Sequence, residues 1–426
     1  MGGLIFAAPS SGSGKTTLTL GFLRAVSRSG AAIRSAKSGP DYIDPRFHAA
    51  ASGHPCINLD AWAMTPDRLR SLARHKAGET LLIEGAMGLF DGAPPDSRGS
   101  TADLARILGQ PVVLIIDCAR MAGSVAAIYH GFKHHDPRIY LAGVILNNVG
   151  SPRHEAMLRR ALGDTPVFGA VPRDTGLAHP SRHLGLQQAG ERADLDAFLD
   201  HAADIMDAHL ETDALLRLSM ERKVPLGTSH PMRPPAQTIA VAQDLAFGFC
   251  YPHMLDDWRR AGAQVTPFSP LNDDAVPPAD FVFLPGGYPE LHAGKLAANS
   301  NFMQSLRNAA QTSDIYGECG GYMALGEGLI DADGTRHRMA GLLALETSFA
   351  ARKLHLGYRA LTTDHPLLHG SYTGHEFHYA TTLRADGTPL FKATDAEGTA
   401  LPPMGLRAAR TCGSFAHIID AGLPAS

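Results

Sequence analysis

Apolar residues in the first part of the chain form short, nearly continuous runs separated by longer segments of mixed polarity. The runs cover residues 4–8, 80–88, 111–118, 140–149 and 166–172. Runs of this kind are typical of strands buried on both faces of a parallel sheet, and the segments between them are typical of covering helices. The pattern therefore predicts a doubly wound α/β domain over residues 1–190.

A second series of apolar runs begins after residue 237 and predicts a second α/β domain over residues 238–426. Its runs cover residues 238–249, 262–269, 279–287 and 314–321. Between the two series, residues 191–222 have a helical pattern, and residues 224–237 contain four prolines with little periodicity. We assign residues 191–237 to a helical segment and a linker.

Length and composition agree with two globular domains and exclude several classes of protein. A chain of 426 residues is too long for one ordinary core. The net charge of −4 gives no basic field for nucleic acid or an anionic membrane surface. No uninterrupted apolar run approaches the roughly 18 residues of a membrane span, and the first run lacks a basic leader. The five cysteines form no C-x-x-C pair, which favours a reducing cytoplasm over a disulfide framework or a zinc ribbon.

Residues 9–16, PSSGSGKT, resemble the phosphate-binding pattern G-x-x-x-x-G-K-[ST], with Pro9 at the first glycine position. The segment follows a predicted strand and precedes a predicted helix, as that motif requires. Backbone N–H groups around Gly12 and Gly14 would face phosphate oxygens, Lys15 would neutralise phosphate charge, and the Thr16 hydroxyl would ligate Mg²⁺. The sequence thus predicts an ATP site.

Three acidic residues lie where they could serve that site. Glu84 ends an apolar run and is followed by glycine, so it is a candidate for the acidic partner of the phosphate loop. Asp41 and Asp44 lie in the segment KSGPDYIDPRFH. They could be ordinary turn formers, or they could face metal or substrate at the carboxyl end of the sheet. The residues alone leave both readings open.

Residues 317–321, GECGG, place a cysteine among glycines directly after a predicted strand. A tight turn of this kind exposes a nucleophile, and the following N–H can stabilise an oxyanion. A second donor could come from Gly286–Gly287, and His417 is the histidine best placed by pattern to act as a base. The alternative is that Cys319 is a buried structural cysteine.

Several segments, taken in order, resemble the corrinoid a,c-diamide synthases of cobalamin biosynthesis. They are APSSGSGKTT, KSGPDYIDP, NLDAW, IEGAMGLFDG, FLPGGYPE, YGECGGYM, GHEFHYA and GSFAHI. The resemblance extends from residue 4 to about residue 420, which is nearly the whole chain. It implies a dethiobiotin-synthetase-like ATP domain with a parallel sheet, fused to a class I glutaminase α/β domain.

The resemblance also implies a reaction. Glutamine is hydrolysed in the C-terminal domain, and ATP with Mg²⁺ phosphorylates a corrin carboxylate in the N-terminal domain. Ammonia then displaces phosphate, so that the a and c acetate side chains become amides. ATP, glutamine and a corrin ring are the implied small-molecule partners, and a homodimer is the implied assembly.

The resemblance implies roles for individual residues, taken from the positions that match the family's motifs. The nucleotide would be bound by Gly12, Ser13, Gly14, Lys15, Thr16 and Thr17, with Asn147 or Asn148 against adenine. Thr16, Asp41 and Glu84 would hold the metal, and Asp41, Tyr42, Asp44 and Asp91 would face the substrate. Cys319 would be the nucleophile, His417 its base, and the N–H groups of Gly287 and Gly320 the oxyanion hole. Glu376 and His378, in GHEFHYA, have no role that the residues alone suggest.

Two features depart from the general patterns, and alternatives stay open. Class I glutaminases often carry a glutamate two residues after the histidine, but position 419 is Ile. Hydrogenobyrinate is the favoured corrin because of the chain length and the N-terminal segment, with cobalt-containing cobyrinate as the alternative. A P-loop nucleotide switch without amidation activity is a second alternative, and a cobyric acid synthase a third. The switch would leave the Cys319 turn without a use.

Overall fold

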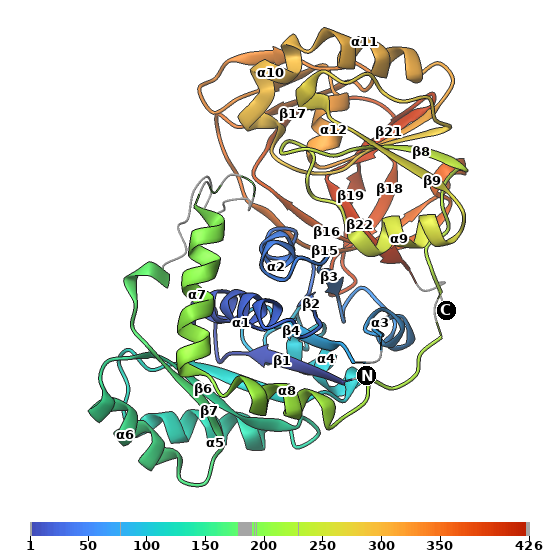
Figure 1. Ribbon diagram of the computed structural model, residues 1–426. Coiled ribbons are helices and arrows are strands. Elements are labelled where there is room, and N and C mark those ends of the chain that lie inside the picture. Colours follow the sequence, from blue (N-terminus) through green and yellow to red (C-terminus); the bar gives the residue numbers. More distant parts are fainter. Residues whose placement is uncertain are drawn as a thin grey trace. The chain divides into compact units, whose positions relative to one another are not determined.

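The computed structural model describes residues 2–76, 78–177, 190, 192, 194–228 and 230–422. These residues form two compact units, Met1–His230 and Pro231–Ser426, which are described separately below (Figure 1). The boundary expected at residue 190 adjoins residues 178–189, 191 and 193, which lie outside the described residues.

The first unit is built on a seven-stranded sheet in the order β3-β2-β4-β1-β5-β6-β7. All neighbouring strands in it are parallel. The strands are β1 (Gly2–Ala7), β2 (Ile33–Ser38), β3 (Ile57–Leu59), β4 (Thr80–Glu84), β5 (Val112–Asp117), β6 (Leu141–Val149) and β7 (Val167–Pro172). This confirms the predicted parallel α/β architecture, since each predicted apolar run overlaps one of these strands.

Helices connect and cover these strands. They are α1 (Lys15–Arg28), α2 (Asp44–Ser52), α3 (Pro66–Leu72), α4 (Thr101–Leu108), α5 (Ser124–His135), α6 (Pro152–Leu162), the 3₁₀ turn η1 (Thr175–Leu177), α7 (Leu195–His209) and α8 (Thr212–Met220). Helix α7 lies beside α1, and ion pairs from Arg24 to Asp200 and from Arg28 to Asp204, both 2.8 Å, join the two (Figure 1). The helices expected within residues 191–222 thus belong to the first unit.

The second unit contains a six-stranded sheet in the order β20-β21-β11-β10-β8-β9. All pairs are parallel except β20 with β21. The strands are β8 (Thr238–Ala242), β9 (Gln264–Phe268), β10 (Phe281–Leu284), β11 (Asp314–Glu318), β20 (Leu406–Ala408) and β21 (Thr411–Ser414). The associated helices are α9 (Pro252–Arg260), η3 (Pro270–Asn272), η4 (Pro289–His292), α10 (Ala293–Ala298), α11 (Ser300–Ala309) and α12 (Gly320–Leu325).

The second unit also has two sheets with mainly antiparallel pairing that the apolar runs did not predict. One has the order β13-β12-β14-β17, with β12 (Gly328–Ile330), β13 (Arg336–Arg338), β14 (Leu345–Ser348) and β17 (Thr381–Ala385). The other has the order β19-β18-β15-β16-β22. Its strands are β15 (His355–Thr363), β16 (Gly370–His378), β18 (Phe391–Thr394), β19 (Ala400–Met404) and β22 (Ala416–Ala421). The 3₁₀ turn η5 (Pro366–Leu368) lies between β15 and β16 in the chain. Strands such as β15 are partly exposed and polar, so they lack the apolar run of a buried parallel strand.

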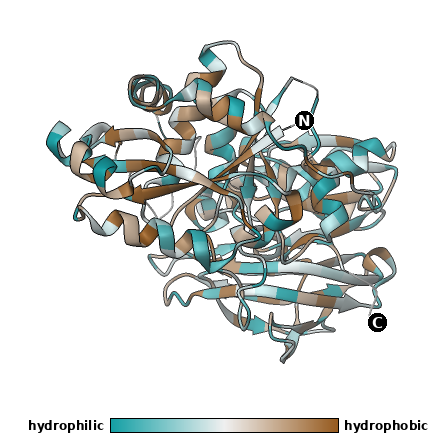
Figure 2. Cartoon of the chain, turned by 90° about the horizontal axis from the view of Figure 1, so that it is seen from below, coloured by the Kyte–Doolittle hydropathy of each residue, from teal (hydrophilic) through white to brown (hydrophobic). Residues whose placement is uncertain are grey.

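Figure 2 shows strands with apolar stretches and helices on which apolar and polar residues alternate. Strand β1 is buried along its whole length, as is β10. Both central strands can be buried because helices cover a parallel sheet from both sides. The polar groups that matter for function therefore lie at strand ends.

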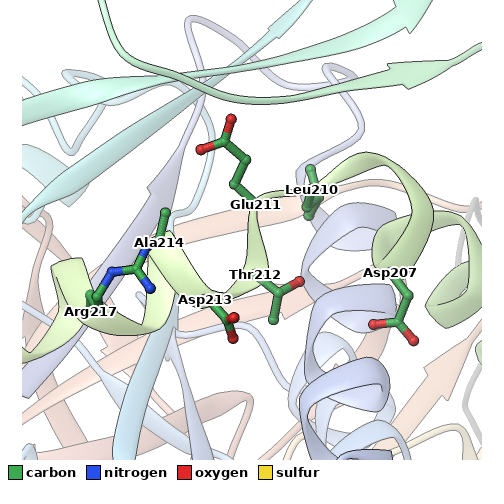
Figure 3. Close-up of a pocket in the computed structure, with 7 residues that line it drawn as sticks. All are labelled: Asp207, Leu210, Glu211, Thr212, Asp213, Ala214 and Arg217. Atoms are coloured by element: carbon green, nitrogen blue, oxygen red, sulfur yellow. The ribbon is translucent and has the colours of Figure 1, made fainter.

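One pocket of the first unit lies where α7 meets α8, away from the predicted site residues. It is lined by Asp207, Leu210, Glu211, Thr212, Asp213, Ala214 and Arg217, and in Figure 3 Glu211 points to the opposite side from Asp213. Its side chains include three acids, and the Thr212 hydroxyl is buried without a hydrogen-bond partner among the described residues. Among the described residues, no helix is long and apolar enough to cross a membrane.

Candidate functional site

The phosphate loop joins β1 to α1, and its geometry depends on Gly14. This residue is the N-cap of α1 in the left-handed region, with φ 87°. A side chain on Gly14 would place a Cβ 2.2 Å from the Nδ2 atom of Asn147. That amide donates to the Ser13 carbonyl at 3.0 Å. Asn147, predicted to lie against adenine, thus supports the loop from β6, and only glycine fits at position 14.

Lys15 lies over this loop with its ammonium group held by backbone carbonyls. Its Nζ donates to the Met87 carbonyl at 2.6 Å and to the Ser10 carbonyl at 3.3 Å. Burial lowers the pKa of Lys15, while Glu84 raises it. A cation held at the N-terminus of a helix is suited to phosphate oxygens. The lysine is therefore in the place expected for a phosphate ligand.

A buried set of charges lies at the carboxyl ends of β2 and β4. Lys37 donates to Asp44 Oδ2 at 2.6 Å and to Glu84 Oε1 at 2.8 Å. Thr16 donates to the same Glu84 oxygen at 2.6 Å. Burial lowers the pKa of Lys37, but Asp44 and Glu84 outweigh it and raise the pKa well above its ordinary value. Lys37 and Glu84 therefore stay charged although both are buried.

His48, on α2, contacts the other oxygen of Glu84. Its Nε2 lies 2.6 Å from Glu84 Oε2, and its Nδ1 lies 3.5 Å from the sulfur of Cys56. Burial lowers the pKa of His48, but Cys56 and Glu84 raise it to about 10. Burial alone would raise the pKa of Glu84, yet Lys37 and His48 hold it well below its usual range. Neither partner was predicted from the sequence; a lysine inside the strand-like run IRSAKS was the available clue.

The other residues predicted to face substrate or nucleotide make local contacts. Asp41 accepts the Ile43 N–H at 2.7 Å, which is the turn-forming role that the sequence left open. Burial raises the pKa of Asp41 to about 7. Asp91 accepts the Gly88 N–H at 2.9 Å, and Asn148 donates to Asp117 at 2.9 Å.

Two further predicted residues, Tyr42 and Thr17, are buried or nearly so. The Thr17 hydroxyl lies 3.5 Å from the Leu177 carbonyl.

The oxygens near Thr16 match the chemistry of Mg²⁺. This ion prefers hard oxygen ligands, and a hydroxyl and two carboxylates meet here. The Thr16 hydroxyl lies 3.4 Å from Asp44 Oδ2 as well as 2.6 Å from Glu84 Oε1. Of the predicted metal ligands, Thr16 and Glu84 are therefore in contact. Asp44 lies beside Thr16 and adds a second carboxylate to the site. The residues present fit the ion.

Cys319 lies in the second unit, between β11 and α12, with its backbone in a strained conformation. Its φ is 44° and its ψ is −102°, which is rare for a residue with a side chain. Its N–H donates to the Ser414 carbonyl at 2.8 Å, and its sulfur lies 4.0 Å from the Phe377 carbonyl. A strained turn directly after a parallel strand is typical of a nucleophile that must be presented from a sheet edge.

Two backbone amides converge beside this cysteine. The Gly320 N–H forms a hydrogen bond to the Cys319 sulfur and lowers its pKa, but burial has the larger effect and raises that pKa well above its ordinary value. A side chain on Gly320 would place a Cβ 2.9 Å from the Gly287 nitrogen. The amides of Gly287 and Gly320 are therefore neighbours, as two donors to one oxyanion must be.

His417 is the second residue of β22, the last described strand of the second unit. It pairs in register with His375 of β16, and a Cβ on Gly286 would lie 2.1 Å from its Cε1 atom. Burial, followed by His375 and His378, lowers the pKa of His417 to about 3. A neutral imidazole can accept a proton, which is what a general base requires.

A glutamate that the sequence-based analysis missed connects the two residues. Glu318 directly precedes Cys319 and is 2% exposed. Its Oε1 accepts the Ile418 N–H at 2.9 Å, and its Oε2 lies 3.8 Å from the Nδ1 atom of His417. Burial raises the pKa of Glu318 to about 8. The acid thus links the end of β11 to the strand that carries His417.

The segment GHEFHYA flanks the cysteine through the Phe377 carbonyl. Glu376 accepts from Arg359 Nη2 at 2.7 Å and contacts His378 Nε2 at 2.9 Å. His355, Glu376 and His378 each offer a ligand atom within 4.8 Å of the others. Both carboxylate oxygens of Glu376 have partners within the described residues, so these side chains form a connected ion-paired network with Arg359.

Family models match both units of the chain. The CobQ/CobB/MinD/ParA nucleotide binding domain matches residues 4–186, and the CobB/CobQ-like glutamine amidotransferase domain matches residues 238–422. The second match, to a glutamine amidotransferase domain, favours an amidotransferase over the nucleotide switch that the sequence left open. Together the two matches cover the centres around Lys15 and Cys319.

Full-length relatives agree with this assignment. The chain is 53% identical over 430 residues to the hydrogenobyrinate a,c-diamide synthase of Rhizobium meliloti, covering 99% of each chain. It is 52% identical over 434 residues to that of Brucella anthropi, covering 99% of each, and 52% identical over 429 residues to that of Rhodobacter capsulatus, covering 98% of each. Identity of this extent over nearly whole chains places the protein in one family with them: the chain belongs to the hydrogenobyrinate a,c-diamide synthase family of glutamine-dependent amidotransferases.

Proposed function

We propose that this chain converts the a and c acetate groups of hydrogenobyrinate to amides, with ATP and Mg²⁺ activating each carboxylate and glutamine supplying the nitrogen. The observation that carries the proposal is the presence of two separate chemical centres in one chain. One has a phosphate loop beside Lys15 and Thr16, and the other has a strained cysteine beside two amides and a histidine. The names of the relatives supply the substrate.

The first centre suits phosphoryl transfer to a carboxylate. Ammonia cannot displace an oxide from a carboxylate, so the oxygen must first attack the γ-phosphorus of ATP and release ADP. Lys15 would exchange its carbonyl partners for phosphate oxygens, and Thr16, Asp44 and Glu84 would hold Mg²⁺. When bound, that ion neutralises charge on the transferring group. Attack by ammonia on the acyl phosphate then releases phosphate and leaves the amide.

The second centre suits hydrolysis of glutamine. The Cys319 proton moves to the neutral His417, and the sulfur attacks the side-chain amide carbon. The amides of Gly287 and Gly320 stabilise the oxyanion, and His417 returns the proton as ammonia leaves. Water then attacks the thioester and releases glutamate. A sheltered site keeps the product as NH₃ rather than ammonium.

The corrin can be identified directly. The purified protein is incubated with ATP, Mg²⁺, glutamine and either hydrogenobyrinate or cobyrinate, and the products are weighed by mass spectrometry. We expect hydrogenobyrinate to gain two amides, together with glutamate, ADP and phosphate. Conversion of cobyrinate alone would assign the cobalt-containing substrate, and a single amidation would contradict the a,c assignment.

The source of ammonia is tested by replacing the nucleophile. Cys319→Ala should abolish amidation with glutamine and retain it with ammonium salts, because the ATP centre is in the other unit. Amidation by this variant with glutamine would overturn the proposed role of Cys319. The homodimer implied by the resemblance stays a prediction, testable by light scattering of the same preparation.

A further inference from the structure

We infer that Glu318 positions His417 in the glutaminase centre, in the role that a glutamate two residues after the histidine has in other class I glutaminases. This inference rests on the proposed function of Cys319 and His417. Its basis is geometric: the Glu318 carboxyl is anchored to the backbone next to His417, and its other oxygen lies 3.8 Å from the Nδ1 atom of the ring.

The anchor fixes the carboxyl where it can act. Glu318 ends β11, which pairs with β21, so its backbone belongs to the rigid parallel sheet. Its Oε1 accepts the Ile418 N–H at 2.9 Å, and Ile418 is the residue after His417. The second oxygen then lies 3.8 Å from Nδ1. Catalytic contacts are often long in an empty site and shorten when substrate binds, so a small rotation of the carboxyl completes this hydrogen bond.

A contact at Nδ1 has a specific chemical consequence. When an acid accepts the Nδ1 proton, the lone pair of the neutral ring is at Nε2, which becomes the base. The same carboxylate stabilises the imidazolium that forms when the thiol proton arrives. Glu318 also precedes the nucleophile by one residue, so one strand end places both the acid and the sulfur.

Glu376 is the other acid near His417, and its contacts argue against this role. Its oxygens accept from Arg359 and contact His378, so the carboxylate already neutralises other groups. Position 419, where the usual acid would stand, is Ile419 and is fully buried. Among these three positions, only Glu318 offers the imidazole a carboxyl oxygen that is within 4 Å in the structure.

The pH dependence expected for glutaminase activity follows from the ionisation of Glu318. The active form needs Glu318 ionised, and burial raises the pKa of this acid to about 8. The surrounding titratable and charged groups are Tyr316 of β11, Glu290 of η4, His375, Glu376 and His378 of β16, and Arg359 of β15. Glutaminase kcat/KM should therefore rise with pH up to about 8, and a variant without this carboxyl should lack that rise.

The test compares Glu318→Gln with Glu327→Gln in the full-length protein. Glutamine at position 318 keeps an oxygen for the Ile418 N–H but cannot be ionised, so it separates the structural contact from the charge. We expect glutaminase kcat to fall at least tenfold, with KM nearly unchanged, no rise toward pH 8 and normal amidation with ammonium salts. Glu318→Asp should recover part of kcat. Glu327, an exposed acid paired with Arg384, is the control, and its replacement should change none of these values.

The outcomes separate this inference from the function on which it rests. Glu318→Gln could keep the wild-type glutaminase kcat and pH profile while Cys319→Ala has no glutaminase activity. In that case Glu318 has no positioning role, and Cys319 remains the nucleophile. If Cys319→Ala still hydrolyses glutamine, the proposed centre itself is wrong. If Glu318→Gln also loses amidation with ammonium salts, its effect is structural and the inference is overturned.

Discussion

Glu84 and Glu318 occupy equivalent places in the two units, yet their ionisation is opposite. Each is the last residue of a parallel strand, and each side chain is almost completely buried, with 0% and 2% exposure. Lys37 and His48 hold the pKa of Glu84 well below its usual range. Burial raises the pKa of Glu318 to about 8, and a backbone N–H opposes that shift only in part. Burial alone therefore does not set the charge of a strand-end acid; the groups that contact it do.

The difference matches what each centre has to do. A nucleotide centre has to neutralise phosphate charge, so a fixed set of charged side chains is useful there. In the cysteine centre, burial favours the neutral forms of Cys319 and His417, and charge develops only when the thiol proton moves. Four predictions test this contrast.

The largest expected effect is on stability. Glu84→Gln leaves the buried His48 without its carboxylate and the buried Lys37 with Asp44 alone, and loss of one partner of a buried pair costs about 3–5 kcal/mol of the free energy of unfolding. Glu318→Gln should have no such cost at pH 7 and should instead raise the free energy of unfolding of the second unit, because a neutral glutamine need not take up a proton on folding as the buried acid does.

This pair of variants can be followed with the two tryptophans of the chain. Trp62 lies in the first unit and Trp258 in the second, so urea unfolding in Trp258→Phe and Trp62→Phe backgrounds reports each unit separately. The pKa of Glu318 is raised on folding, so the wild-type second unit loses stability as pH rises from about 4.3 to about 8. Glu318→Gln should remove that loss. Equal costs for the two substitutions at pH 7 would contradict the contrast.

The second prediction concerns catalytic rate at the ATP centre. Lys15→Ala should lower amidation at least about a hundredfold with either glutamine or ammonium salts, because it removes the cation over the phosphate loop. Glutamate release should persist, since the cysteine centre belongs to the other unit. Arg159→Ala, which breaks an exposed pair with Glu155, is the control. Unchanged amidation in Lys15→Ala would rule out the phosphate role.

The third prediction concerns the space around His417. Gly286→Ala would place a methyl group 2.1 Å from the ring, so the imidazole or the loop must move. We expect a loss of about 1–3 kcal/mol in the stability of the second unit and a fall in glutaminase kcat. Gly294→Ala is the matched control, because its methyl group would meet His337 at an ordinary 3.5 Å. Equal behaviour of the two variants would show that His417 does not depend on this close approach.

The smallest expected effect concerns thiol reactivity. Burial raises the pKa of the Cys319 thiol, so little thiolate is present near neutral pH. Without glutamine, alkylation of Cys319 by iodoacetamide at pH 8 should be about tenfold slower than that of a free cysteine and should still increase above pH 9. Peptide mass spectrometry, with Cys319→Ala as the blank, identifies the label. A rate that levels off below pH 8.5 would indicate a thiolate at rest.

The sequence by itself determined the parallel cores and the two reactive motifs. Continuous apolar runs can be satisfied only by strands buried on both faces, so β1, β4, β5, β10 and β11 could be predicted from them. The phosphate loop and the GECGG turn could be predicted because glycine is required there for backbone reasons, at Gly14 for instance. The family resemblance added roles for these residues, and the family matches confirmed the function class.

Only the tertiary structure decided which charged groups meet. Lys37 contacts Glu84, 47 positions away in the chain, and Glu318 lies beside His417, about 100 positions away, and neither pairing leaves a local pattern. The antiparallel strands β15 and β16, partly exposed and polar, also lacked a clear apolar run. Strand-end acids such as Glu84 and Glu318 look alike in the sequence. Their ionisation depends on neighbours that the fold brings to them, because only at short range and in a buried setting do such charges interact strongly.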